Sequence, residues 1–290
     1  MLMIKKYTQI LLSQQAKRLG CAIFTCLLCN YPNLLAMDHN GRGTKAIGMA
    51  NAFVAVSDNC WAISYNPAGL MKVTDFQCSA FIVPEQFGLQ ELKTIALAAA
   101  TPVSFGSIGM TAVKFGFDLY SETEIELAVA NKIDRNISVG LSVSYNRLAI
   151  ARYGTAGSFF VCGGFIAQML EGLDAGFDVY NMTASTIGKT KENIPQVIDL
   201  GMCWSPFNRF KISFDIEKDI HYPASIKAGF EQIIYSIVAI RAGAATNPDK
   251  CSWGIGVTCE AFAFGYAGYS HPDLGWTHQI EISYKPEKSQ

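Results

Sequence analysis

The sequence is poor in charged residues. Only 16% of its 290 residues are Asp, Glu, Lys or Arg, whereas an average soluble domain carries roughly 25%. After the N-terminal region, no apolar run reaches the roughly 18 to 20 residues that a membrane-spanning helix needs. The formal net charge is -1, and no cluster of Lys or Arg follows the first eighteen residues. We therefore expect neither a polytopic helical membrane protein nor a nucleic-acid-binding protein.

The residue patterns of catalytic and metal sites are also missing. The four histidines are isolated from one another, and neither a GxSxG motif nor a GxxxxGK[ST] motif occurs. The six cysteines after residue 36 have no CxxC spacing, so we expect mostly free thiols. These absences predict a protein that is not an enzyme and that has no metal and no cofactor.

The first 36 residues resemble a secretory signal. Positive charges precede an apolar run at residues 19–28, and Ala36 supplies a small residue at the cleavage position. We expect a signal peptide over residues 1–36. The alternative, a transmembrane anchor, is disfavoured because the apolar run is short and is followed closely by Asn30 and Pro32.

From residue 74 onward, apolar and polar side chains alternate with a period of two. In the clearest stretch, Ile137, Val139 and Leu141 share one face, while Ser138 and Gly140 share the other. Such runs are separated by short polar turns and predict about 14 strands. Two of the expected strands cover residues 172–187 and 194–204.

The two faces of these strands favour a membrane barrel over an exported β-sandwich. One face carries large apolar side chains, and the other mixes Gly, Ser and Ala with a few charges. A sandwich would carry Lys and Glu throughout its solvated face. We therefore predict an all-β protein, a transmembrane antiparallel β-barrel over residues 74–290, in contact with lipid of the bacterial outer membrane. The charged side chains expected to face the lumen are Lys114, Asp118, Glu124, Glu126, Arg241 and Glu260.

Two stretches carry a resemblance to a known family. The first is GRGTKAIGMANAFVAVSD at residues 41–58, followed by WAISYNPAGL at residues 61–70. The second is the C-terminal third, with WSP at 204–206, DIEKD at 215–219 and a last strand that ends at Tyr284. Together they resemble the PorV/PorQ-type branch of the FadL-like (long-chain fatty-acid transporter-like) outer-membrane β-barrels.

The resemblance implies a 14-stranded barrel whose N-terminal segment enters or plugs the lumen. By position, residues 37–73 are the plug-like segment, and its NPA element is Asn66, Pro67, Ala68 and Gly69. The small residues of this segment suit tight packing in a narrow lumen. The alternative is a short amphipathic helix over residues 46–56 that caps the barrel mouth.

The last strand resembles the signal that the barrel assembly machinery reads. Thr277, Ile282 and Tyr284 match this signal. Gln279 stands where Gly is usual, and six residues follow Tyr284. The alternative is an ordinary terminal strand.

The resemblance leaves two functions open. PorV-type relatives dock other proteins in type IX secretion, whereas FadL-like relatives pass small hydrophobic molecules across the outer membrane. The inward faces are small and polar, which argues against a generous hydrophobic channel. We therefore predict a secretion-accessory or docking role with secretion-system components as partners, and transport of a small hydrophobic ligand as the alternative.

Overall fold

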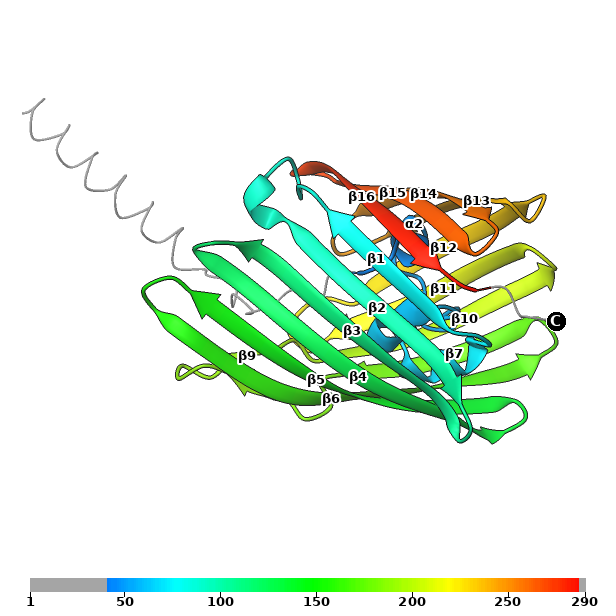
Figure 1. Ribbon diagram of the computed structural model, residues 1–290, viewed down its shortest axis with the longest axis horizontal. Coiled ribbons are helices and arrows are strands. Elements are labelled where there is room, and N and C mark those ends of the chain that lie inside the picture. The colour runs from blue at the N-terminus through cyan, green and yellow to red at the C-terminus, as the bar shows by residue number, and fades with distance from the viewer. Residues whose placement is uncertain (1–40, 287–290) are drawn as a thin grey trace, which may run out of the picture. The chain divides into compact units, whose positions relative to one another are not determined.

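The computed structural model describes residues 41–286 (Figure 1). The signal peptide expected over residues 1–36 lies outside the described residues, as do residues 37–40. None of the helices between residues 41 and 286 has the length and apolar character that crossing a bilayer requires.

Fourteen strands form one closed antiparallel barrel, in which β1 pairs with both β2 and β16 (Figure 1). The predicted fold class is therefore confirmed. The strands of the barrel are β1 (Gln77–Val83), β2 (Thr94–Val103), β3 (Gly106–Phe117), β4 (Tyr120–Asp134), β5 (Ile137–Ile150), β6 (Gly154–Leu170), β7 (Leu173–Tyr180), β10 (Val197–Phe207), β11 (Phe210–Asp219), β12 (Ser225–Ile234), β13 (Val238–Ala245), β14 (Lys250–Cys259), β15 (Phe262–His271) and β16 (Gly275–Tyr284).

The segment between β7 and β10 differs from the expected pair of strands. The strand expected over residues 172–187 ends at Tyr180, and residues 181–196 form a loop with its own hairpin of β8 (Thr186–Ile187) and β9 (Glu192–Asn193). Asn181 ends the strand, because its φ is 53° and its side chain accepts a hydrogen bond from the backbone N–H of Ser185. Asn tolerates this left-handed conformation better than most residues.

The outer wall of the barrel is a band of large apolar side chains. Leu127, Leu141 and Leu200 are each more than half exposed, at 57%, 55% and 54%. Their neighbours Glu126 and Ser142 point inward and are buried. A closed barrel has no free sheet edge, and its apolar band can face the hydrocarbon of a bilayer. Both features are required of a β-structure that spans a membrane. The protein is therefore an outer-membrane β-barrel.

The two ends of the barrel differ in their connections. At one end the strands are joined by tight turns, such as residues 208–209 and 260–261. At the other end the connections are longer, as at residues 84–93, 181–196 and 220–224. We refer to these as the short-turn end and the long-loop end. Outer-membrane barrels place short turns on the periplasmic side.

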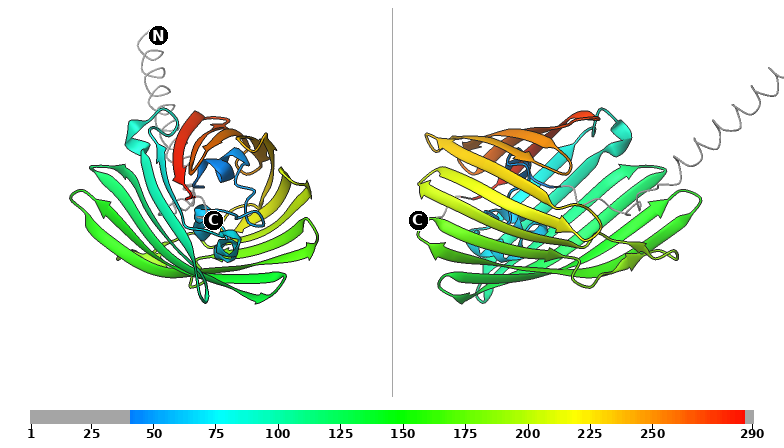
Figure 2. Two further views of the ribbon diagram at one scale, coloured as in Figure 1. Left: turned by 45° about the vertical axis from the view of Figure 1, so that its right-hand side comes forward. Right: turned by 180° about the vertical axis from the view of Figure 1, so that it is seen from behind.

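Residues 41–73, here called the inner segment, lie within the barrel (Figure 2). They contain α2 (Thr44–Gly48) and two short 3-10 helices, η1 (Cys60–Ser64) and η2 (Pro67–Lys72). A third, η3 (Gln90–Leu92), lies in the loop after β1. Asn59 caps η1 and Asn66 caps η2, each by accepting a backbone N–H hydrogen bond. The helix considered for residues 46–56 is not formed, because α2 ends at Gly48 and turns follow.

Candidate functional site

The inner segment is held to the barrel wall by buried ion pairs. The guanidinium of Arg42 pairs with the carboxylate of Glu124 on β4, and its Nη1 also donates to Ser64 Oγ (3.0 Å). Both Arg42 and Glu124 are buried. Although burial works against the charged form, Glu124 raises the pKa of Arg42 above its ordinary value. This pair therefore fixes the start of the inner segment to the wall.

A second contact is a cluster of five charged side chains, here called the charge cluster. Lys45 Nζ lies 2.9 Å from Asp58 Oδ2 and 2.8 Å from Glu231 Oε1. Lys211 pairs with Asp58, and Arg241 Nε lies 2.7 Å from Glu231 Oε2. Burial alone would raise the pKa of Asp58, but Lys211 and Lys45 together lower it. The cluster joins the inner segment to β11, β12 and β13.

The NPA element connects the inner segment to β5, β6 and β7. Asn66 Nδ2 donates to the carbonyl oxygens of Val54 (3.1 Å), Phe165 (3.1 Å) and Phe177 (3.3 Å). A Cβ atom at Gly140 of β5 would lie 2.4 Å from the backbone nitrogen of Ala68. The element therefore packs directly on the wall.

Replacing Asn66 by alanine is expected to destabilise the seating of the inner segment by about 1–3 kcal/mol, because buried carbonyl groups lose their donor. The measurement is the urea concentration at which limited proteolysis first cuts the inner segment of the assembled barrel. Asn208→Ala, in an exposed turn, is the matched control. Equal protection of the two variants would contradict this role.

Two further wall carboxylates hold the inner segment, and sequence reasoning missed both. Glu281 accepts hydrogen bonds from Thr44 N (2.6 Å), Thr44 Oγ1 (2.8 Å) and Trp61 Nε1 (2.7 Å). Asp215 accepts one from Val54 N (2.9 Å). Each lies on the inward face of an alternating strand, which was the signal that could have identified it.

The six charged residues expected in the lumen fall into two groups. Glu124, Glu126 and Arg241 point inward, and Glu126 accepts from Ser142 Oγ (2.6 Å) and Ser64 Oγ (3.2 Å). Lys114 and Asp118 require correction, since both are exposed outside the lumen, whereas Glu260 is an exposed turn residue that also lines a cavity at the short-turn end.

Lys114 shares the outer face of β3 with Ile108 and Met110, because strand alternation places it there. Asp118 lies in the turn between β3 and β4, and Glu260 lies in the turn between β14 and β15. Turns at the ends of the barrel are exposed to water, so a charged side chain there is solvated without facing the lumen.

The residues of the expected assembly signal lie on both faces of β16. Thr277 is buried and accepts a hydrogen bond from Phe87 N (3.0 Å). Ile282 and Tyr284 are exposed on the outer wall, where the Tyr284 ring lies 5.1 Å from that of Phe262.

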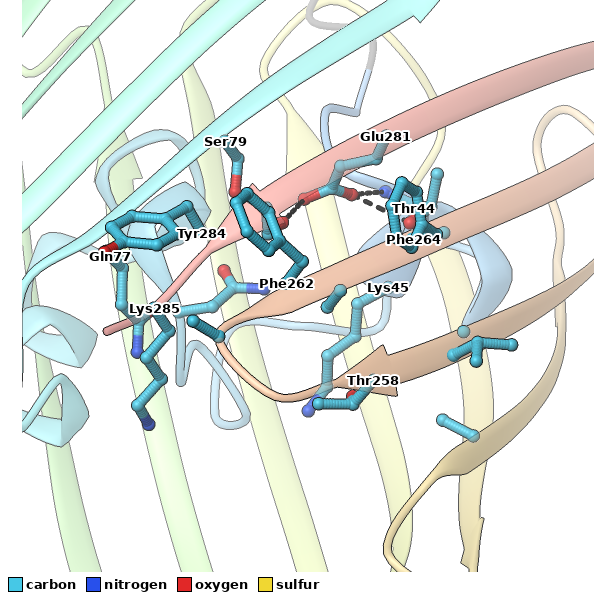
Figure 3. A pocket seen from close by; sticks show the side chains of 18 of the residues that line it. Thr44, Lys45, Gln77, Ser79, Thr258, Phe262, Phe264, Glu281, Tyr284 and Lys285 are labelled. Atoms are coloured by element: carbon cyan, nitrogen blue, oxygen red, sulfur yellow. Dashed lines mark hydrogen bonds between the residues drawn. The ribbon is translucent and has the colours of Figure 1, made fainter. Parts of the chain in front are cut away.

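Cavities lie on both sides of residues 44–51. The cavity at the short-turn end, here called the vestibule, has a volume of about 520 Å³, and Thr44, Lys45 and Glu281 are among its lining residues (Figure 3). The cavity at the long-loop end has about 280 Å³, and Ala50 and Asn51 are among its lining residues. The stretch between them packs on wall glycines. A Cβ at Gly243 would lie 2.5 Å from the carbonyl carbon of Met49.

The long-loop half of the lumen also holds a buried apolar cluster. Its rings Phe160 and Tyr180 pack edge to face with centroids 4.8 Å apart. The cluster consists of Phe160, Cys162, Tyr180, Ile187, Ile194 and Val197. Between residues 41 and 286, no three His, Cys, Asp or Glu side chains are grouped as metal ligands.

Comparison with known proteins places the fold. No protein-family model matches the sequence, and no curated protein matches it significantly. The solved structures that are similar over most of the chain include the three described next. The monoaromatic hydrocarbon channel CymD has a TM-score of 0.65 and 12% identity, over 88% of this chain and 100% of that chain. The toluene transporter TbuX of Ralstonia pickettii has a TM-score of 0.66 and 10% identity, over 87% and 100%.

A FadL homologue of Pseudomonas aeruginosa has a TM-score of 0.61 and 10% identity, over 84% of this chain and 98% of that chain. At such low identity the likeness shows the fold alone. None of these three is described as a PorV/PorQ-type protein or as a secretion component. The chain therefore has a FadL-like barrel fold.

Proposed function

We propose that this barrel is not an enzyme and that it lets small hydrophobic molecules cross the outer membrane, with the inner segment as its plug. The observation that carries the proposal is the pair of cavities on either side of residues 44–51. A molecule that leaves the long-loop cavity reaches the vestibule once this stretch moves away from β13. Ala239, Val257, Ala261 and Ala263 give the vestibule an apolar surface that such a molecule prefers to water.

The hydrocarbon channels and transporters that share this fold support the same reading. The docking role in secretion, expected from the PorV/PorQ resemblance, gains no support from them. No feature of residues 41–286 favours docking over passage either.

The test is uptake of labelled toluene by Gram-negative cells that produce the full chain. Producing cells are expected to take up toluene several times faster than cells with an empty vector. The control is a lockable variant, Thr44→Cys with Gly265→Cys, in a background whose native cysteines are alanine. A Cβ at Gly265 would lie 3.0 Å from Thr44 Cβ, so a small shift brings the pair to disulfide geometry.

Oxidation of this pair is expected to abolish the gain in uptake, and reduction to restore it. Uptake that never exceeds the vector level contradicts the proposed function. Uptake that survives oxidation contradicts the path past residues 44–51.

A further inference from the structure

The outer wall of the barrel carries a row of polar side chains near the long-loop end, here called the basic row. It consists of Lys114 on β3, Thr123 on β4 and Arg147 on β5, which are neighbours in the register of these strands. Lys114 and Arg147 are exposed, and each lies three residues before the last residue of its strand. Neither cation forms an ion pair or a side-chain hydrogen bond with any residue of 41–286.

The register sets the spacing of the basic row. Neighbouring strands lie about 4.8 Å apart, so the backbones of Lys114 and Arg147 are separated by roughly 10 Å. Both side chains are long and flexible enough to reach one group that lies between them. The hydroxyl of Thr123 is placed there to add a further hydrogen bond. The row can therefore hold a single anion with three side chains.

Below the basic row, toward the middle of the barrel, the outer wall is apolar. The next two rows of the register consist of Ala112, Ile125 and Tyr145, and of Met110, Leu127 and Val143. Ile125 and Leu127 are 43% and 57% exposed. A ligand that matches this face of the barrel therefore has an anionic head above an apolar body.

The strands around the basic row contribute no opposing charge on the outer wall. The register partners of Lys114 and Arg147 on the flanking strands β2 and β6 are Ile95 and Gly157. Glu122 of β4 follows the inward alternation of its strand, and it accepts a hydrogen bond from the hydroxyl of Tyr120. The two positive charges of the row are therefore not balanced on this face.

The connections at the long-loop end do not balance the row either. Those nearest to it add two acids and two bases, all exposed, so their charges cancel: Glu91, Asp118, Lys93 and Arg152. Glu85 begins the loop after β1, two strands away from Lys114.

The basic row lies at the height of lipid headgroups. Outer-membrane barrels have their longer loops on the extracellular side, so this end of the wall meets the outer leaflet. Lysine and arginine near the end of a spanning strand extend their charged groups to the headgroups, while their stems stay on apolar surface. The order of charge and apolar surface on the wall is thus the order found in a lipid.

We propose that the basic row binds the phosphate group of a lipid in the outer leaflet, with the acyl chains of that lipid on the apolar rows below. Ammonium and guanidinium groups form charge-assisted hydrogen bonds with phosphate oxygens. Basic clusters at a membrane surface recognise anionic headgroups in this way. The site lies on the outside of the barrel and is independent of passage through the lumen.

The test is native mass spectrometry of the purified, detergent-solubilised full chain mixed with lipid A, which measures the affinity for the first bound lipid. Lys114→Gln combined with Arg147→Gln is expected to weaken this affinity about tenfold or more. The matched control, Lys218→Gln with Arg209→Gln, removes the same two charges elsewhere and should bind as the parent does. Lys218 already donates to the carbonyl oxygen of Tyr222, and Arg209 lies in an exposed turn.

Two further measurements separate the phosphate group from the rest of the lipid. Lipid A without its phosphate groups is expected to bind the parent at least about tenfold more weakly. Inorganic phosphate at tenfold molar excess over lipid A is expected to leave binding unchanged, because it has no acyl chains to bury. Displacement at this ratio would assign the row to free phosphate and overturn the lipid as its occupant.

The difference in gel mobility between boiled and unboiled samples verifies that each variant is folded. If the double variant fails to fold, Lys114→Gln alone takes its place, with an expected loss of affinity of about threefold. Equal affinity of the parent and the folded variant for lipid A overturns the proposal. Equal affinity of the parent for lipid A with and without its phosphate groups does so as well.

Discussion

Replacing Glu231 by glutamine is expected to release the inner segment from the wall at a cost of about 3–5 kcal/mol, while the barrel stays assembled. Glu231 is 1% exposed and is the carboxylate that Lys45 and Arg241 share. Glutamine keeps the size of the side chain but removes its charge. The three cations of the cluster, Lys45, Lys211 and Arg241, would then have only Asp58 as a counter-ion within the cluster.

Cys60 is the reporter for this release. It lies in η1 of the inner segment, is 1% exposed, and burial raises the pKa of its thiol to about 12, so it stays protonated and unreactive. With Cys60 as the remaining cysteine, Glu231→Gln is expected to speed its labelling by maleimide about a hundredfold or more. Glu260→Gln, in an exposed turn, is the control.

Unboiled gel mobility should be the same for Glu231→Gln, the control and the parent. If Cys60 is as protected in Glu231→Gln as in the parent, the charge cluster does not hold the inner segment. Loss of the folded band would show instead that Glu231 stabilises the barrel wall itself.

The barrel could be predicted because strand alternation is local. A few neighbouring residues are enough to identify the outward and inward faces of a strand, as Leu141 and Ser142 show on β5. The strand predicted over residues 172–187 was too long because Asn181 ends it through hydrogen bonds to its own loop. Counting alternating apolar and polar residues does not detect a side chain that ends a strand in this way.

The charge of a side chain alone did not predict whether that side chain faces the lumen or the exterior of the barrel. Lys114 lies near the long-loop end of β3, where a long side chain on the outer wall can extend to the lipid headgroups. Asp118 and Glu260 follow the ends of strands, where water replaces the lumen as the polar environment. A charge is therefore informative only when its strand phase and its distance from the barrel end are both known.

The contacts of the inner segment could not be predicted from residue patterns. Glu281 binds Thr44 across 237 positions of sequence, and Asp215 binds Val54 across 161. Alternation shows that each acid points inward, but it does not show which backbone N–H meets it. That choice depends on how the inner segment turns, for which Asn59 and Asn66 were the visible local signals.

Substituting arginine for Leu141 is expected to destabilise the barrel by about 2–4 kcal/mol, the range for an arginine near the bilayer midplane. Leu141 lies on the outer face of β5, and Val129 is its register partner on β4. The guanidinium of the arginine must either lose its hydration or draw water into the hydrocarbon layer. The measurement is urea unfolding of the protein in lipid vesicles, followed by tryptophan fluorescence.

Leu141→Ala separates the effect of charge from that of size, because it removes apolar area without adding charge. We expect it to cost less than the arginine variant, since lipid can fill the space left by the side chain. In water the order would reverse, because an exposed leucine tolerates arginine with a change of about 0.5 kcal/mol or less. A stability of Leu141→Arg equal to that of the parent would therefore mean that this face of the barrel does not contact lipid.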